Sequence, residues 1–167
     1  KQYPDAHFLF LSSIVRIKNH ESLDHDSWKW KGRVVVGGHC IKTATGEKAV
    51  FTGSSSTPSS MEAARMLIAI RAAFPDMELL QSDCIRAYVQ AKMTGSKTFV
   101  RLPKLWWPAA WKDMIDPVCE LLMAPYGHPK AGDIWNTKIH AVLIKHDFVV
   151  VEGWTGVYIR GQGTKDF

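Results

Sequence analysis

The chain has 167 residues, of which 46% are hydrophobic and 22% are charged, values that suit one folded globular domain and argue against a largely disordered chain. The formal charge of +5 arises from 21 Lys and Arg against 16 Asp and Glu, which favours polyanionic partners without requiring them. The three cysteines are far apart and odd in number, which argues against a disulfide framework and paired zinc ligands.

Neither a membrane span nor a secretory signal is expected. A bilayer crossing needs roughly 18 to 20 apolar residues, and even the run from His7 to Ile17 is interrupted by Ser12, Ser13 and Arg16. The sequence begins at Lys1 and shows no signal-peptide pattern, so we expect a processed chain or part of a longer one.

The first predicted strand runs from Trp28 to His39, because β-branched residues follow one another and two glycines then permit a turn or bulge. Lys29, Lys31 and Arg33 alternate within it and therefore share one face. Two interpretations remain open for that face. It contacts phosphate groups, or it is a solvated sheet edge protected by charge.

A loop and a helix follow. Residues 52–60 are rich in Ser, Thr and Gly, as flexible loops are. Ser59 and Glu62 form a capping-box pattern, and helix formers extend from Met61 to Phe74, where Pro75 stops them. We expect a buried helix with three core side chains, namely Met66, Leu67 and Ile70.

A short strand is predicted from Met77 to Ser82, which would place Asp83 at its C-terminal end. Carboxylates at the ends of strands often act as catalytic or metal-binding groups. A lone aspartate is also a common N-cap, here of a helical segment from Ile85 to Ala91. Further strands are predicted at Phe99–Leu102 and Val118–Met123.

The last third of the sequence predicts a helix and two strands. Apolar residues at helical spacing indicate an amphipathic helix from Ala131 to His146. The strands are expected at Phe148–Val151 and Val157–Arg160. Strands and helices do not alternate regularly, which indicates a mixed α+β fold. The glycine-rich nucleotide loops, the GxSxG elbow and the HExxH motif do not occur.

Four segments, in this order, resemble reverse transcriptases of the copia (Ty1/copia) retrotransposon type. They are KGRVVVGG (Lys31–Gly38), ELLQSDCIRAYVQA (Glu78–Ala91), FVRLP (Phe99–Pro103) and VCELLMAPYGHPKAGDIW (Val118–Trp135). The resemblance implies part of the fingers and palm, an α+β fold with a mixed, mainly antiparallel sheet and two main helices. It places the fingers and palm fragment at residues 28–160, with an N-terminal extension of uncertain fold at 1–27 and a C-terminal tail at 161–167.

The resemblance also assigns roles to individual residues. Lys31 and Arg33 would grip the triphosphate of the incoming nucleotide. Asp83 would be the catalytic carboxylate and a Mg²⁺ ligand, and Tyr88 would lie under the nucleotide sugar and exclude a 2′-hydroxyl. Lys130 stands where the family has a glutamine beside the nucleotide.

Two departures from the family pattern affect these roles. His128 and Pro129 replace Leu and Lys, while Gly132 and Asp133 replace Pro and Arg, which puts the nucleotide contacts of this motif in doubt. The family's Tyr-x-Asp-Asp hairpin is not among the 167 residues. We therefore expect bound Mg²⁺ only where a longer parent chain completes the site, and no activity of this chain alone.

Two functions from different classes follow. The first is a fragment of an RNA-directed DNA polymerase that transfers nucleotides to a primer 3′-hydroxyl, with an RNA template, a DNA primer and a dNTP as partners. The second is a retroelement remnant that serves as a non-catalytic structural or interaction subunit of a larger assembly, to which the seven tryptophans would contribute. The first implies a cytoplasmic or nuclear compartment, and the second leaves an organellar one open.

Overall fold

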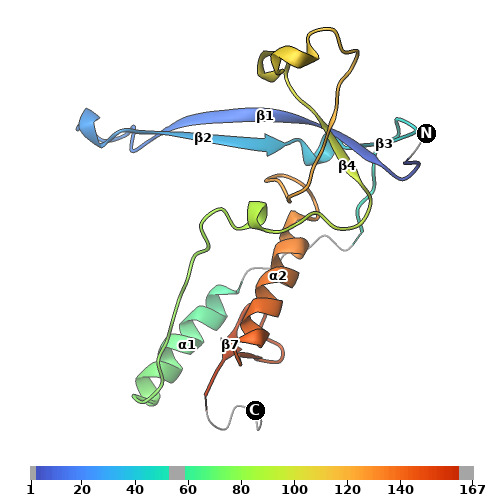
Figure 1. The fold of residues 1–167 in the computed structure, drawn as a ribbon. Helices are drawn as coiled ribbons and strands as arrows, with labels where there is room; N and C mark the ends of the chain where they lie inside the picture. The colour runs from blue at the N-terminus through green and yellow to red at the C-terminus, as the bar shows by residue number, and fades with distance from the viewer. Residues whose placement is uncertain (1–2, 53–58, 162–167) are drawn as a thin grey trace.

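The structure is a computed structural model that describes residues 3–52 and 59–161. A sheet lies at one end, the first α-helix and a small hairpin lie at the other, and the second α-helix extends between them (Figure 1). The elements, in chain order, are β1 (His7–Lys18), β2 (Lys29–Val36), β3 (Lys42–Thr43), α1 (Met61–Ala73), β4 (Thr98–Arg101), β5 (Cys119–Glu120), α2 (Ala131–Lys145), β6 (Val149–Val150) and β7 (Tyr158–Ile159). Short 3-10 helices are η1 (His25–Ser27), η2 (Gly38–Cys40), η3 (Tyr88–Gln90), η4 (Lys104–Trp106) and η5 (Ala109–Trp111).

The main sheet has five strands in the order β2-β1-β4-β5, with β3 also paired to β1. β1 and β4 are parallel, and the other neighbouring strands are antiparallel. β6 and β7 form a separate antiparallel pair. This confirms the expected α+β class with a mixed, mainly antiparallel sheet and two main helices.

β1 is the central strand, and it changes partner along its length. Residues His7 to Phe10 pair with β4, whereas residues Leu11 to Lys18 pair with β2. The strand lies within the first 27 residues, for which the sequence predicted no element. Its position between β2 and β4 makes this segment integral to the sheet.

The sheet is held by a small apolar core. Five buried side chains form it, namely Leu9, Val36, Ile41, Ala49 and Val100. β4 shows how the alternation works, because Thr98 and Val100 point inward while Phe99 and Arg101 are half-exposed. Sheet residues two apart share a face, so one short strand contributes two core positions.

A second cluster joins η3 to the start of α2. Its buried members are Ala91, Ala124, Ala131 and Ile134. Three of them are alanines, which let the backbones approach closely. The backbone N–H of Ala124 donates to the carbonyl of Ala91 at 2.8 Å. This cluster positions Tyr88, which is half-buried against it.

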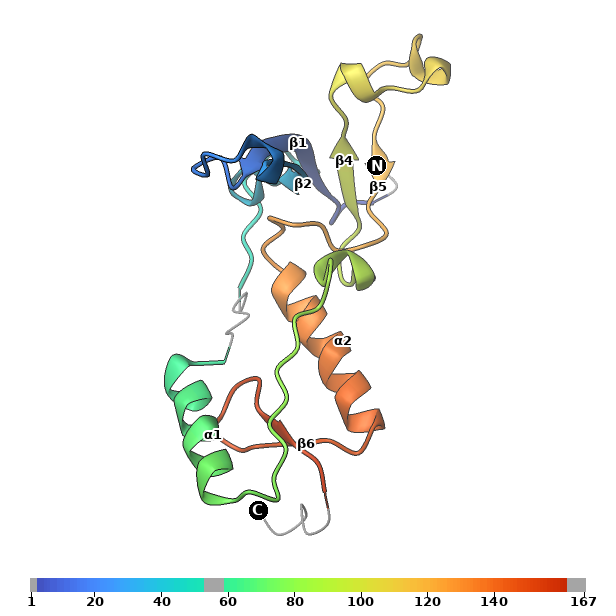
Figure 2. The same ribbon diagram turned by 90° about the vertical axis from the view of Figure 1, so that its left-hand side faces the viewer.

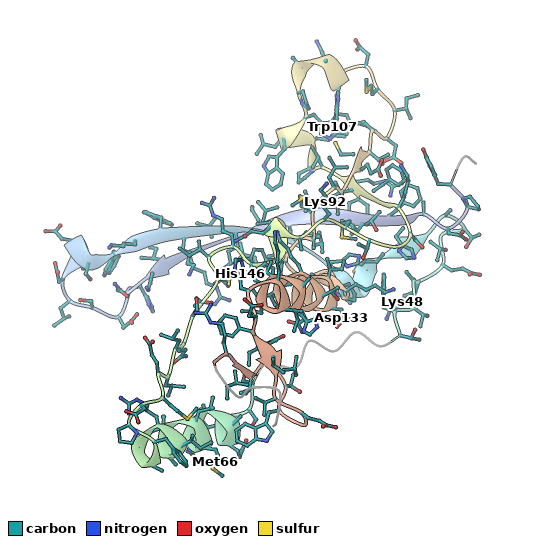
Figure 3. All side chains as sticks on the ribbon, turned by 60° about the horizontal axis from the view of Figure 1, so that its bottom comes forward. Lys48, Met66, Lys92, Trp107, Asp133 and His146 are labelled. Atoms are coloured by element: carbon teal, nitrogen blue, oxygen red, sulfur yellow. The ribbon has the colours of Figure 1, made fainter. Side chains whose placement is uncertain are left out.

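The α1 helix is confirmed in extent but not in its cap or burial. The N-cap is Ser60, whose hydroxyl accepts from the N–H of Ala63 at 3.1 Å, rather than Ser59. Ala63 is the buried residue of α1, and Met66 is 51% exposed. Figure 3 shows the helix that carries Met66 well away from the sheet. The expectation that this helix is buried is therefore wrong.

The strand predicted from Met77 to Ser82 is also wrong. Residues 77–84 form a connector without strand or helix, exposed except at the half-buried Cys84, which runs from the end of α1 to η3 (Figure 2). The helical alternative for Ile85–Ala91 reduces to η3, so Asp83 caps no α-helix. A strand needs a neighbour to pair with, and none of the described strands pairs with this connector.

The other predicted elements are confirmed with adjusted ends. The Trp28–His39 strand shortens to β2, the Phe99–Leu102 strand is β4, and the last two strands are β6 and β7. The Val118–Met123 strand shortens to β5, although Met123 forms a bridge to Lys92. α2 ends one residue before the predicted end.

Neither described helix is both long enough and apolar enough to span a membrane.

Candidate nucleic-acid interface

The β1–β2 ribbon carries a row of basic side chains on one face. Arg16 lies directly opposite Lys31, and Lys18 lies opposite Lys29. Opposite residues of an antiparallel pair share a face, and Arg33 is two residues from Lys31. The face therefore holds five cations, which we call the basic ladder, namely Arg16, Lys18, Lys29, Lys31 and Arg33. All of them are exposed.

No carboxylate among the described residues forms an ion pair with this ladder. Like charges opposite one another destabilise a strand pair, and ladder partners have Cα atoms only about 4.5 to 5.5 Å apart. The ion pairs found in the described part of the chain are His20–Glu21, Lys97–Glu120 and Arg101–Asp116. The ladder is thus free to bind an external anion such as a phosphate.

The opposite face of the ribbon is largely apolar. Trp30 pairs with Ile17, and Gly32 pairs with Val15. Trp30 is 76% exposed, because the ribbon projects beyond the rest of the molecule (Figure 1). The loop at its tip is fixed by two hydrogen bonds, from Asn19 Nδ2 to the carbonyl of Ser27 and from Trp28 Nε1 to the carbonyl of Ser22, both at 3.1 Å.

The other end of β2 is joined to the turn that precedes α2. The backbone N–H of Val36 donates to the carbonyl of Tyr126 at 2.9 Å. Gly127 has φ of 88°, and a Cβ atom there would lie 2.2 Å from the carbonyl oxygen of Val36. A Cβ atom on Gly38 would lie 2.3 Å from the carbonyl oxygen of Gly127. This contact needs glycine at both positions, because any side chain would separate the two backbones.

The junction brings Tyr88 close to the end of β2. Its ring packs against Tyr126, with ring centroids 5.2 Å apart and planes tilted by 55°. Tyr126 is in turn bonded to Val36, three residues after Arg33, a separation of about 10 Å along a strand. The structure therefore links Tyr88 to the strand that carries Lys31 and Arg33.

Lys130 occupies the N-cap position of α2 and is exposed. Its positive charge contributes to lowering the pKa of His7 and of His128, so its ammonium lies near both rings. The helix that it begins packs against the cluster that holds Tyr88. Lys130 thus belongs to the same neighbourhood as Tyr88 and Tyr126.

Asp83 stands apart from these residues. It is exposed in the connector before η3, and none of the hydrogen bonds or ion pairs among the described residues involves it. Within residues 3–52 and 59–161, no three His, Cys, Asp or Glu side chains come together as metal ligands. A lone carboxylate cannot hold two Mg²⁺ ions about 3.5 to 4 Å apart, so these residues do not fit a two-metal centre by themselves.

The sequence did not reveal three residues of the candidate interface, namely Arg16, Lys18 and Tyr126. Arg16 and Lys18 alternate in a run of β-branched residues, a signal that would have found β1. Their place in the ladder depends on the register with β2, which the sequence does not reveal. The pairing of Tyr126 with Tyr88 likewise requires the fold.

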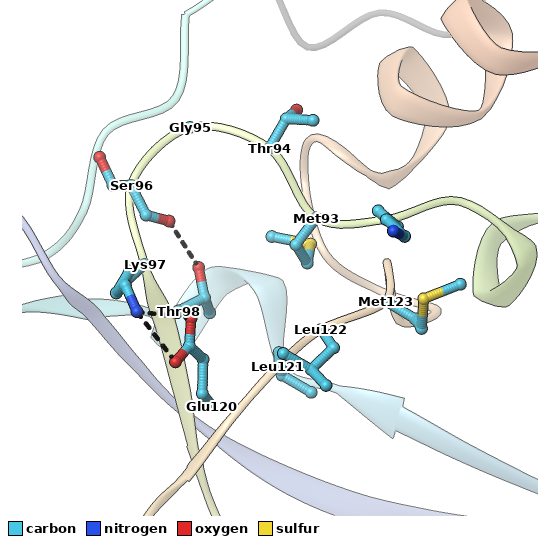
Figure 4. A pocket seen from close by; sticks show the side chains of 11 residues that line it. Met93, Thr94, Gly95, Ser96, Lys97, Thr98, Glu120, Leu121, Leu122 and Met123 are labelled. Atoms are coloured by element: carbon cyan, nitrogen blue, oxygen red, sulfur yellow. Dashed lines mark hydrogen bonds and ion pairs between the residues drawn. The ribbon is translucent and has the colours of Figure 1, made fainter.

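A separate depression of about 400 Å³ lies between residues 92–98 and residues 120–123. Figure 4 shows it, with Lys97 bonded to Glu120 at 3.0 Å on one side. Neither the ladder nor any predicted site residue lines it. We therefore do not assign it to the candidate interface.

A family model described as "Reverse transcriptase (RNA-dependent DNA polymerase)" matches residues 13–167. The match begins inside β1 and includes every predicted site residue. No curated protein and no solved structure matches the chain. Because the family model covers most of the sequence, the chain belongs to the reverse transcriptase (RNA-dependent DNA polymerase) family.

Proposed function

We propose that the chain is a fingers and palm portion of a copia-type RNA-directed DNA polymerase, in which the basic ladder holds phosphates of the nucleic acid or the incoming nucleotide. The observation that carries this proposal is the β1–β2 register, which places five exposed cations on one face. Family membership supports nucleic acid as the partner class. The copia type is supported by the four motif segments.

The ladder offers two kinds of phosphate contact. The guanidinium groups of Arg16 and Arg33 can each bind two phosphate oxygens, whereas the lysines act as compact point charges. Alternate residues of a strand are about 6.8 Å apart, so Lys29, Lys31 and Arg33 form a regularly spaced track. Such a track suits a ligand with several phosphates better than a single small anion.

Tyr88 and Lys130 have roles near the Val36 end of β2, beyond Arg33. The Tyr88 ring is held against Tyr126, and it would give a nucleotide sugar a fixed surface. The exposed ammonium of Lys130 would add a phosphate contact beside it. Both roles are proposals that come from the resemblance, supported by the proximity described above.

Asp83 is proposed as one metal ligand of the polymerase site. Mg²⁺ prefers hard oxygen ligands such as carboxylates, and the two-metal site of this chemistry needs more of them than Asp83 provides. The proposal therefore requires further carboxylates from a Tyr-x-Asp-Asp motif in a longer polypeptide. We expect DNA synthesis only from such a polypeptide.

Binding of a labelled RNA–DNA hybrid at salt concentrations from 50 to 200 mM tests the ladder. Affinity should fall steeply with salt, since each neutralised phosphate contributes a slope of about −0.9 in log affinity against log salt for duplex DNA. The double variant Arg16→Ala/Lys31→Ala should bind more weakly, with a slope lower by about two units if both residues contact phosphates.

The matched control is Lys48→Ala/Lys112→Ala, which removes the same charge at exposed positions outside the ladder. Figure 3 marks Lys48. This control should keep nearly the wild-type slope. If both double variants lose the same amount of affinity for the hybrid, the binding reflects net charge alone, and the ladder has no special role.

A further inference from the structure

One buried histidine plays no part in the proposed polymerase function. His128 lies in the turn before α2 and is only 5% exposed. Its Nδ1 accepts a hydrogen bond from the backbone N–H of Lys130 at 3.2 Å. An accepting Nδ1 places the proton of the neutral ring on Nε2. Nε2 is buried without a hydrogen-bond partner among the described residues, so a polar atom is left unsatisfied even when the ring is neutral.

The groups around the ring are apolar or cationic. The ring packs edge-on against Phe51 at 5.4 Å, and Phe51 also packs against His7 of β1 at 5.1 Å. The charges that act on His128 come from His7 and Lys130, and both oppose its protonation. The positive end of the α2 dipole has the same sign.

The remaining titratable groups on the adjoining elements are few. η2, next to the turn, carries the exposed His39 and the exposed thiol of Cys40. Asp5 acts on His7, whose pKa it raises against the larger effect of burial. Asp133 is in the first turn of α2, five residues beyond His128. No ion pair in residues 3–52 and 59–161 joins a carboxylate to His128.

The turn around His128 is closely seated on the sheet. The Val36 N–H bonds to Tyr126, and Gly127 and Gly38 fit with no room for a Cβ atom. The carbonyl of His128 also accepts the N–H of Ala131, at 3.0 Å, where α2 begins. Closely packed contacts of this kind are either made or lost, because they do not deform continuously.

We propose that His128 is a proton-sensitive latch, whose neutral ring keeps the 125–130 turn seated on the end of β2 and whose protonation releases the turn. A proton from solvent would bind Nδ1, where the lone pair now accepts the N–H of Lys130. Two N–H groups would then face one another. Neither N–H group of the imidazolium would have an acceptor among the described residues, so the ring would move to water and uncouple α2 from the sheet.

The size of the effect follows from the environment. Burial, His7 and Lys130 lower the pKa of His128 to about 4, and in the released turn the ring would titrate near the ordinary value of about 6.5. The equilibrium constant for release should therefore rise about twentyfold between pH 7 and pH 5. This proposal does not depend on nucleic-acid binding.

Amide hydrogen exchange of the 167-residue chain at pH 7 and pH 5, corrected for intrinsic exchange rates, tests the latch. Protection of the Val36 and Ala131 amides should fall about twentyfold at the lower pH. His128→Leu cannot take up the proton, so its protection should stay constant. His39→Leu, which alters an exposed histidine on the neighbouring turn, should keep the wild-type fall.

Equal protection at both pH values in the wild-type chain overturns the proposal, and so does the same fall in His128→Leu. Should His128→Leu fail to fold, NMR titration of the His128 ring in the wild-type chain decides the matter. A ring that titrates near 6.5 while Val36 stays protected would show that protonation leaves the turn seated.

Discussion

Gly127 has less room for a side chain than any other glycine that the structure describes. It combines φ of 88° with a backbone geometry that would put a Cβ atom 2.2 Å from the carbonyl oxygen of Val36. Gly127→Ala should lower the free energy of unfolding by about 3 kcal/mol or more, because backbone strain of about 1 to 3 kcal/mol adds to the steric clash. Urea unfolding would measure the loss.

Gly95→Ala is the matched control for this change. Gly95 has φ of 85°, but a Cβ atom there would meet nothing within 4 Å. Gly95→Ala should therefore lower the free energy of unfolding only by the backbone strain, about 1 kcal/mol. Equal losses in the two variants would mean that the contact between Gly127 and Val36 contributes nothing beyond the strain.

Asp83 should matter for activity and not for stability. It is exposed and has no bonded partner in the described residues, so Asp83→Asn should change the free energy of unfolding by less than about 0.5 kcal/mol. In a longer polypeptide that carries Tyr-x-Asp-Asp, the same change should abolish primer extension on an RNA template with Mg²⁺. Asp76→Asn, at an exposed position in the turn just before the connector, should retain activity. Extension that survives Asp83→Asn would remove Asp83 from the metal site.

At the level of elements, the β1–β2 ribbon shows a conflict between stability and binding. Arg16→Glu would replace a repulsive cross-strand pair with Lys31 by an attractive one, which should stabilise the chain by about 0.2 to 1 kcal/mol. The same change should weaken binding of an RNA–DNA hybrid, because it puts a negative charge in the ladder. Thermal unfolding and salt titrations on one protein preparation would measure both effects.

Lys112→Glu is the control for that pair of effects, since it changes the net charge by the same amount at an exposed position outside the ladder. It should weaken binding less and should not stabilise the ribbon. A destabilised Arg16→Glu variant would contradict the view that the ladder is held together against its own repulsion.

Some of the strands and helices could be predicted from the sequence alone, and others could not. β2, β4, α2 and the strands β6 and β7 were predicted because each has a local pattern that matches its period. The burial of α1 and the strand from Met77 to Ser82 were predicted wrongly, because burial and pairing depend on what lies next to a segment. The apolar residues Leu79 and Leu80 of the Met77–Ser82 segment remain exposed in the structure.

The candidate site was predictable in part for the same reason. Alternation along a strand put Lys31 and Arg33 on one face, and the resemblance supplied Asp83, Tyr88 and Lys130. The cross-strand contribution of Arg16 and Lys18 could not be predicted, since it depends on a register of pairing between distant residues. A one-residue slip would turn Arg16 and Lys18 to the opposite face from Lys31 and Arg33.

At the scale of the whole molecule, stability should depend on pH through His128. Its pKa is about 4 in the folded chain and about 6.5 when unfolded, so the unfolded chain binds more protons between these values. The stabilisation from the neutral ring is therefore complete above about pH 6.5 and is lost as the pH falls toward about 4. Between pH 7 and pH 5 the free energy of unfolding should fall by about 2 kcal/mol from this group.

Carboxylates affect a lower pH range, which allows the two effects to be separated. Arg101 holds the pKa of Asp116 below its ordinary value, so that contribution is lost only as the pH falls below about 4. Urea unfolding from pH 8 to pH 5 thus reports mainly on the histidines. His128→Leu should flatten the decline in this range and His39→Leu should not. A decline that persists unchanged in His128→Leu would assign it to other groups, with His7, whose pKa burial also lowers, as the next to replace.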